Sequence, residues 1–288
     1  MPLTDELRVA AALAPDSPVL AAIQDHYGEQ GTIVTLGEDS DLDALAGESW
    51  SLIVVDWRVE PARSFVEAIK VSRRTSRTPV VAIYEEGSTL GCYRPMVIEP
   101  DLEVAEPVDA KALMAQTDRL LERQRTRPRH FFQDLVVRLG TDDDEIDRAH
   151  EFYDRLLEEL GYSEYDQVTL SHSFREALGN AAEHGNKKDP DRMLRIATIV
   201  DHEKVAFVVT DEGPGFDHVA YMQKANNESA LATTKGRDEN VRPGGLGVHI
   251  MKTACDAIEF NDSGNSIFLM KYLPGVKDEG EGEEAGEG

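Results

Sequence analysis

The sequence has 288 residues, enough for two domains at roughly 150 residues each. Its 30 lysines and arginines face 55 aspartates and glutamates, and the formal net charge of −25 argues against nucleic acid or an anionic membrane as the main partner. Two cysteines, in different halves, exclude a disulfide framework and a zinc site. Neither a basic N-terminal patch nor an apolar run of membrane-spanning length is present, so we expect a cytoplasmic protein.

Residues 1–124 alternate short apolar runs with amphipathic segments, which is the pattern of βαβ units. Such units place successive strands in one parallel sheet, so we predict a doubly wound, five-stranded α/β domain. The predicted strands are 7–13, 32–36, 51–57, 78–84 and 102–105, and the predicted helices are 18–30, 63–74 and 109–124.

A basic segment containing proline, RQRTRPRH, follows at residues 123–130. Proline interrupts regular structure, and basic residues are common after a helix C-terminus. We therefore interpret residues 125–130 as a linker in preference to a phosphate-binding segment.

Residues 131–275 mix helical segments with hairpins and predict a two-layer α/β sandwich with a mixed sheet. One helix is expected to end at Gly161, and Ser163 is expected to cap the next, which runs to about His184. The acidic tail, residues 276–288, is predicted to be disordered. The predicted strands are 131–140, 193–200, 205–210, 257–260 and 266–273, and the predicted helices are 141–161, 163–184 and 244–255.

The segment SFREALGNAAEHGN places Glu176, Asn180 and His184 four residues apart, and therefore on one face of a helix together with His172. Gly185 is predicted to end this helix in the left-handed conformation. The residues predicted to face the core are Leu170, Phe174, Leu178 and Ala181.

Two glycine clusters follow. DEGPGFD places Asp211 at a strand end, just before Gly213 and Gly215, where the backbone can approach a ligand closely. PGGLG, residues 243–247, precedes a helix whose first N–H groups suit phosphate. The polar stretch between them, residues 216–242, is long enough to be a lid.

Together these motifs resemble the GHKL-type ATP-binding domain, and the variant EALGNAAEHGN is most similar to the anti-sigma-factor serine kinases of bacterial partner-switching systems. The resemblance implies that Asp211 accepts a hydrogen bond from the adenine amino group and that the Asn180 amide oxygen binds Mg²⁺. Glu176 would be the general base, and His184 a structural hydrogen-bonding residue. The other implied nucleotide-contact residues are Gly213, Gly215, Gly244, Gly245, Gly247 and, in the lid, Arg242 and Lys224.

Residues 7–124 resemble a response-regulator receiver domain, with Asp56 at the position of the phospho-acceptor. The acidic pair expected after the first strand is absent, and Glu106 replaces the expected lysine. We therefore favour a pseudo-receiver that binds a partner or dimerises, with Asp56 as a capping or loop carboxylate at a strand end.

The resemblance implies an ATP-dependent serine/threonine protein kinase with ATP and Mg²⁺ as cofactors. Its partners would be a small antagonist protein, a sigma factor or both, and a homodimer is possible. One alternative is a nucleotide-gated module that sequesters a partner without phosphorylating it. Another is a histidine-kinase-like catalytic half that acts on a separate chain.

Overall fold

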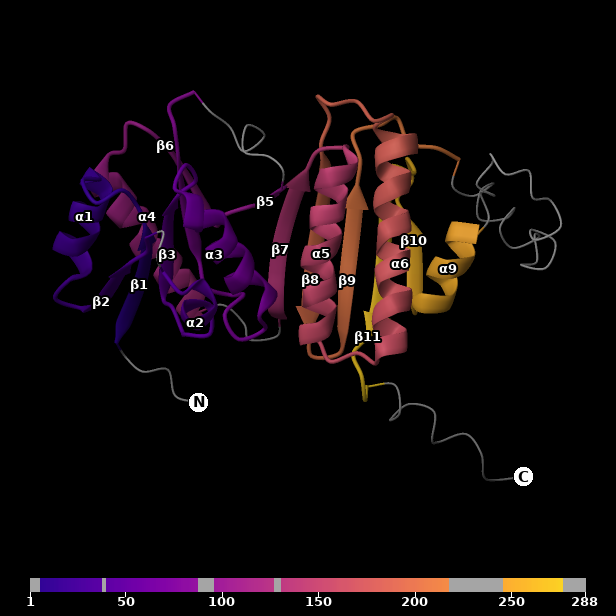
Figure 1. The fold of residues 1–288 in the computed structure, drawn as a ribbon, viewed down its shortest axis with the longest axis horizontal. Coiled ribbons are helices and arrows are strands. Elements are labelled where there is room, and N and C mark those ends of the chain that lie inside the picture. The colour runs from indigo at the N-terminus through magenta and orange to yellow at the C-terminus, as the bar shows by residue number, and fades with distance from the viewer. Residues whose placement is uncertain (1–5, 38–39, 88–95, 127–130, 218–245, 277–288) are drawn as a thin grey trace. The chain divides into compact units, whose positions relative to one another are not determined.

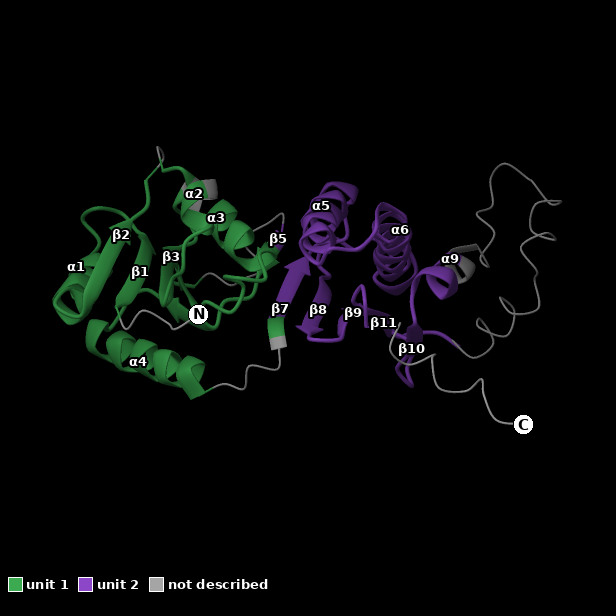
Figure 2. Ribbon diagram, turned by 90° about the horizontal axis from the view of Figure 1, so that it is seen from below, with its two compact units in different colours: residues 1–93, 97–133 green, residues 94–96, 134–288 purple. Residues whose placement is uncertain are grey.

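The computed structural model describes residues 6–37, 40–87, 96–126, 131–217 and 246–276 (Figure 1). The chain forms two compact units, coloured separately in Figure 2. Unit 1 comprises residues 1–93 and 97–133, and unit 2 comprises residues 94–96 and 134–288. No helix in the described part of the chain is long and apolar enough to cross a membrane.

Unit 1 contains a five-stranded sheet in the order β2-β1-β3-β4-β6, in which every pair of neighbours is parallel. This order is that of a doubly wound fold of the receiver type, and it confirms the predicted fold class. The strands are β1 Leu7–Ala12, β2 Gly31–Thr35, β3 Leu52–Asp56, β4 Val80–Tyr84 and β6 Leu102–Ala105, and the helices are α1 Pro18–Tyr27, α2 Leu42–Ala46, α3 Glu60–Val71 and α4 Ala110–Thr126.

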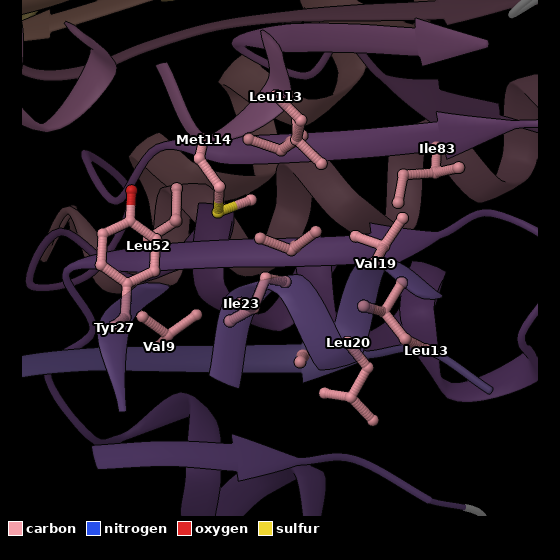
Figure 3. Packing of buried hydrophobic residues seen from close by; sticks show 13 residues of the cluster. Val9, Leu13, Val19, Leu20, Ile23, Tyr27, Leu52, Ile83, Leu113 and Met114 are labelled. Carbon is pink, nitrogen blue, oxygen red and sulfur yellow. The ribbon is translucent and has the colours of Figure 1, made fainter. Parts of the chain in front are cut away.

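Helices cover both faces of this sheet, so its central strands are buried throughout. β3 and β4 have no exposed residue. Figure 2 shows α4 on one face, with α2 and α3 on the other. Side chains of α1 and α4 close the core over the central strands, as Figure 3 shows for Ile23, Leu52 and Leu113.

The sequence pattern missed two short elements, the helix α2 and the strand β5 (Met96–Ile98). α2 has five residues and β5 three. Elements this short contain at most one or two periods of apolar alternation, so their periodicity carries almost no signal.

The second sheet, most of whose strands belong to unit 2, has the order β10-β11-β9-β8-β7-β5. The pairs β8–β9, β9–β11 and β10–β11 are antiparallel, which confirms both predicted hairpins. The helices of unit 2 lie together on one side of the strands in Figure 2, as a two-layer sandwich requires. The elements are β7 Phe131–Leu139, α5 Asp143–Glu159, α6 Glu164–Asn180, η2 Ala181–Gly185, β8 Leu194–Asp201, β9 Lys204–Thr210, α9 Leu246–Ala254, β10 Ala257–Phe260 and β11 Ser266–Tyr272.

Aromatic packing fixes α5 and α6 on this sheet. The Tyr153 ring lies 4.4 Å from that of Phe174 and 5.5 Å from that of Phe207, between ring centroids. Ser163 caps α6 by accepting a hydrogen bond from the Asp166 N–H, as predicted. Gly161 has a φ of +77°, which confirms it as the stop of α5.

Candidate functional site

Helix α6 brings Glu176 and Asn180 together. The Asn180 Nδ2 donates a hydrogen bond of 3.2 Å to Glu176 Oε1, and both side chains are half-buried. All four residues predicted to face the core from this helix are buried. His172 is exposed and makes no hydrogen bond to any described residue, as expected for a surface histidine.

The prediction that Gly185 ends this helix in the left-handed conformation is wrong. α6 continues as one π-helical turn, η2, and the Asn186 N–H donates to the Ala181 carbonyl at 2.8 Å. Gly185 is not left-handed; the left-handed residues are Lys187 and Lys188, with φ of 60° and 54°. That conformation costs about 1–2 kcal/mol for a residue with a Cβ, and such strain is concentrated at functional sites.

Gly185 is required for a different reason, because the end of α6 touches the segment after β9. A Cβ on Gly185 would lie 2.2 Å from Asp211 Cγ, and one on Gly213 would lie 2.3 Å from the Gly185 carbonyl oxygen. Only glycine permits this approach. The contact brings the helix that carries Glu176 and Asn180 next to the first glycine cluster, although the two are about 30 residues apart in sequence.

Asp211 lies at this contact and is 8% exposed. Its Oδ1 accepts a hydrogen bond of 2.8 Å from the Gly213 N–H, and its Oδ2 accepts none from the described residues. Burial raises the pKa of Asp211, and the Gly213 N–H and the charges of Arg192 and Lys187 oppose that rise. A buried carboxylate with one oxygen unengaged is suited to accept an N–H group of a ligand.

The turn between β10 and β11 holds Asp211 from the other side. The Asp211 N–H donates to the Asn265 carbonyl at 3.0 Å, and Asn265 Nδ2 donates to the Asp211 carbonyl at 3.2 Å. Gly215 has a φ of +77°, and a Cβ there would lie 1.8 Å from the Ser263 carbonyl oxygen. The glycines at 213 and 215 are therefore required by contacts within the protein itself.

Asn180 is chemically suited to a magnesium ion. Its Oδ1 accepts no hydrogen bond from the residues that the structure describes, so an amide oxygen remains available beside Glu176. Within the same residues, no cluster of three or more histidine, cysteine, aspartate or glutamate side chains could hold a metal. Mg²⁺ bound by one or two protein oxygens, with phosphate and water as its other ligands, would need no such cluster.

Several predicted contact residues lie outside the described residues: the lid beyond Asp217, Lys224, Arg242, Gly244 and Gly245. Gly247 lies in the first turn of α9, which packs against α6. His184 is exposed and makes no hydrogen bond to a described residue, so its predicted structural role is not observed.

In unit 1, Asp56 ends β3 and is also 8% exposed. Its carboxylate is occupied by Arg58, whose Nε and Nη2 donate to Oδ1 and Oδ2 at 2.8 and 2.7 Å. The same guanidinium donates to both Glu106 oxygens, at 2.8 and 3.0 Å. These bonds, to Asp56 first and then to Glu106, raise the pKa of Arg58. The Arg58 N–H also donates to Asp56 Oδ1 at 2.9 Å, so Asp56 caps the loop after β3.

Sequence reasoning missed Arg58. It identified Glu106 as a replacement for a lysine but supplied no cation for the resulting pair of acids. The one available signal was its position two residues after Asp56, within side-chain reach of the same strand end. That signal is weak, because Arg58 and Glu106 are 48 residues apart and only the fold brings them together.

The family model described as the histidine kinase-like ATPase domain matches residues 121–271, more than half of the chain. The serine-protein kinase RsbW of Bacillus subtilis is 31% identical over 120 residues, 41% of this chain and 72% of that protein. The chain therefore belongs to the histidine kinase-like ATPase family, among serine-protein kinase relatives. RsbW of Bacillus licheniformis is 28% identical over 119 residues, and RsbW of Listeria monocytogenes serotype 4a is 27% identical over 115, with 72% and 70% of those proteins covered and 41% and 39% of this chain.

Solved receiver domains are similar to the first part of the chain. The receiver domain of the sensor histidine kinase PA1611 from Pseudomonas aeruginosa PAO1 is 15% identical, with a TM-score of 0.32, over 41% of this chain and 98% of that one. A CheY-like receiver from Methanospirillum hungatei JF-1 is 14% identical, with a TM-score of 0.34, over 43% and 99%. The receiver-like character of unit 1 follows from its strand order.

Proposed function

We propose that this protein is an ATP-dependent serine/threonine protein kinase of the anti-sigma-factor type. It phosphorylates a small antagonist protein and so controls which partner a sigma factor binds. The observation that carries this proposal is the contact of Gly185 with Asp211, because it joins the helix bearing Glu176 and Asn180 to a buried carboxylate with an open oxygen. This arrangement suits a nucleotide whose purine lies at Asp211 and whose phosphate chain lies near Asn180.

Asp211 Oδ2 accepts the adenine amino group, which is an N–H donor that guanine lacks at the same ring position. Asn180 Oδ1 holds Mg²⁺, which when bound neutralises charge on the phosphate oxygens. In this proposal the phosphates bind the backbone N–H groups of Gly244, Gly245 and Gly247, together with Arg242. Gly213 and Gly215 let the backbone after Asp211 lie close to the purine.

Glu176 is the general base. As the serine or threonine oxygen of the antagonist attacks the γ-phosphorus, the Glu176 carboxylate takes the hydroxyl proton. The new O–P bond forms while the bond from the γ-phosphorus to the β,γ-bridging oxygen breaks, and ADP leaves with that oxygen. The Asn180 Nδ2 orients the carboxylate through Oε1 and leaves Oε2 for the proton.

Residues 1–124 serve as a regulatory pseudo-receiver, with residues 125–130 as a linker and 131–275 as the kinase domain. Arg58 bridges Asp56 and Glu106, so both oxygens of Asp56 are already engaged where a phosphoryl oxygen or Mg²⁺ would have to bind. Asp56 therefore takes no phosphoryl group, and the unit acts by binding a protein.

The decisive experiment incubates the full chain with γ-labelled ATP, Mg²⁺ and candidate antagonist proteins from the same genome. Acid-stable, base-labile label on an antagonist is the expected result, because phosphoserine and phosphothreonine behave in this way. Acid-labile, base-stable label would identify phosphohistidine and a histidine-kinase-like half. Nucleotide binding with no label on any partner would favour a nucleotide-gated sequestering module.

A further inference from the structure

Asn186, the residue after η2, is fully buried, and both the oxygen and the nitrogen of its carboxamide form hydrogen bonds. Its Oδ1 accepts a hydrogen bond of 2.8 Å from the Glu212 N–H, and its Nδ2 donates one of 3.0 Å to the Met193 carbonyl. Glu212 completes the set, because its Oε2 accepts from the Met193 N–H at 3.2 Å. One side chain thus connects the end of the α6 helix, the residue after Asp211 and the residue before β8.

The backbone around Asn186 is held as tightly as its side chain. Its N–H donates to Ala181, and the Lys188 N–H donates to Ala182, both at 2.8 Å. The two left-handed lysines follow at once. Strained residues persist where surrounding contacts over-determine the backbone. The hydrogen bonds of Asn186 are the contacts that fix the backbone beside Lys187 and Lys188.

We propose that Asn186 is a positioning residue that sets the place of Asp211 relative to Asn180. This inference rests on the proposed function, in which Asp211 binds the purine and Asn180 the metal-phosphate end. Asn180 and Asn186 lie at the two ends of the single turn η2, and Asn186 is bonded directly to the residue after Asp211. Asn186 therefore sets the spacing at which one nucleotide can engage both ends.

The test compares Kd values of Mg-ATP and Mg-GTP for the full chain. Loss of folded protein lowers the affinity for both nucleotides by the same factor, so their ratio reports the position of Asp211 alone. We expect Asn186→Ala to reduce the preference for ATP at least about tenfold, because the Glu212 N–H loses its acceptor and the Asp211 turn shifts.

Asn186→Asp is the conservative variant. It keeps an acceptor for the Glu212 N–H but places a second carboxylate oxygen against the Met193 carbonyl, so we expect a smaller reduction. Tyr153→Phe is the matched control, since it removes another buried hydrogen bond of unit 2, the 3.0 Å bond between Tyr153 and Thr198, away from the Asp211 turn. This control should keep the wild-type ratio.

An unchanged ratio in Asn186→Ala, or in Asn186→Asp if the alanine variant does not fold, would overturn the positioning role. A wild-type chain that binds ATP no better than GTP would instead overturn the assignment of Asp211, on which the proposed function depends. The two failures are therefore distinguishable in one set of titrations.

Discussion

Two aspartates end strands in the two units, and they are buried to the same extent: Asp56 after β3 and Asp211 after β9 are each 8% exposed. Their partners differ. Both oxygens of Asp56 accept from Arg58, whereas Asp211 has one backbone donor and an oxygen that no described residue engages. A buried charge is stable only when it is paired. Asp56 is paired within the fold, whereas burial raises the pKa of Asp211 and one of its oxygens has no partner among the described residues.

The largest expected effect concerns phosphotransfer in unit 2, where Asp211 keeps an unengaged oxygen. Glu176→Gln keeps an oxygen that can accept from Asn180 Nδ2 but cannot take a proton. We expect phosphotransfer to fall by about 10²- to 10⁴-fold with ATP affinity preserved. Single-turnover transfer to the antagonist measures the phosphotransfer rate, and calorimetric titration measures the ATP affinity. Unaltered transfer would remove Glu176 from the role of base.

The direct comparison of the two aspartates comes next. Asp211→Asn places an amide N–H₂ group or a weaker acceptor against the adenine amino group, and we expect ATP affinity to fall by about 100-fold. Asp56→Asn is the matched control and should leave the Kd of ATP unchanged. Equal losses in both variants would contradict the division of roles between the units.

The pH dependence of binding provides a smaller effect. Only ionised Asp211 accepts at both oxygens, so ATP affinity should decline as the pH falls through its raised pKa, above the value of about 3.9 for a free aspartate. The contribution of Asp211 to the free energy of unfolding has the opposite sign: it is largest in acid and is lost as the pH rises through that pKa. Titrations at stepped pH measure the decline, and Asp211→Asn should lack this component.

The smallest effect is expected at the paired aspartate. Arg58→Ala leaves Asp56 and Glu106 without their cation, and we expect the free energy of unfolding to fall by about 1–2 kcal/mol, limited because Arg58 is 40% exposed. Denaturant titration measures the change, which added salt should reduce. Arg125→Ala, at an exposed pair 3.9 Å apart, should cost less than about 0.5 kcal/mol. Equal losses in the two variants would show that Arg58 has no special role.

Local pattern was sufficient for most elements and for the helix face that carries Glu176 and Asn180. Apolar runs located every strand of the two sheets except β5, because burial on one or two faces imposes a period on the sequence. Four-residue spacing placed Glu176 and Asn180 on one helix face, and both caps, at Ser163 and Gly161, follow from side chains adjacent in sequence. These features depend on neighbours within a few residues, so the sequence by itself determined them.

Contacts between distant segments were decided only by the tertiary structure. The π turn, the left-handed lysines and the true reason for glycine at 185 arise where α6 meets Asp211, about 30 residues away. Arg58 acquires its role from Glu106 in the same way, and Asn186 from Glu212 and Met193. A residue's partners across the fold leave no periodic trace in its own segment. The availability of each carboxylate therefore follows from the folded chain.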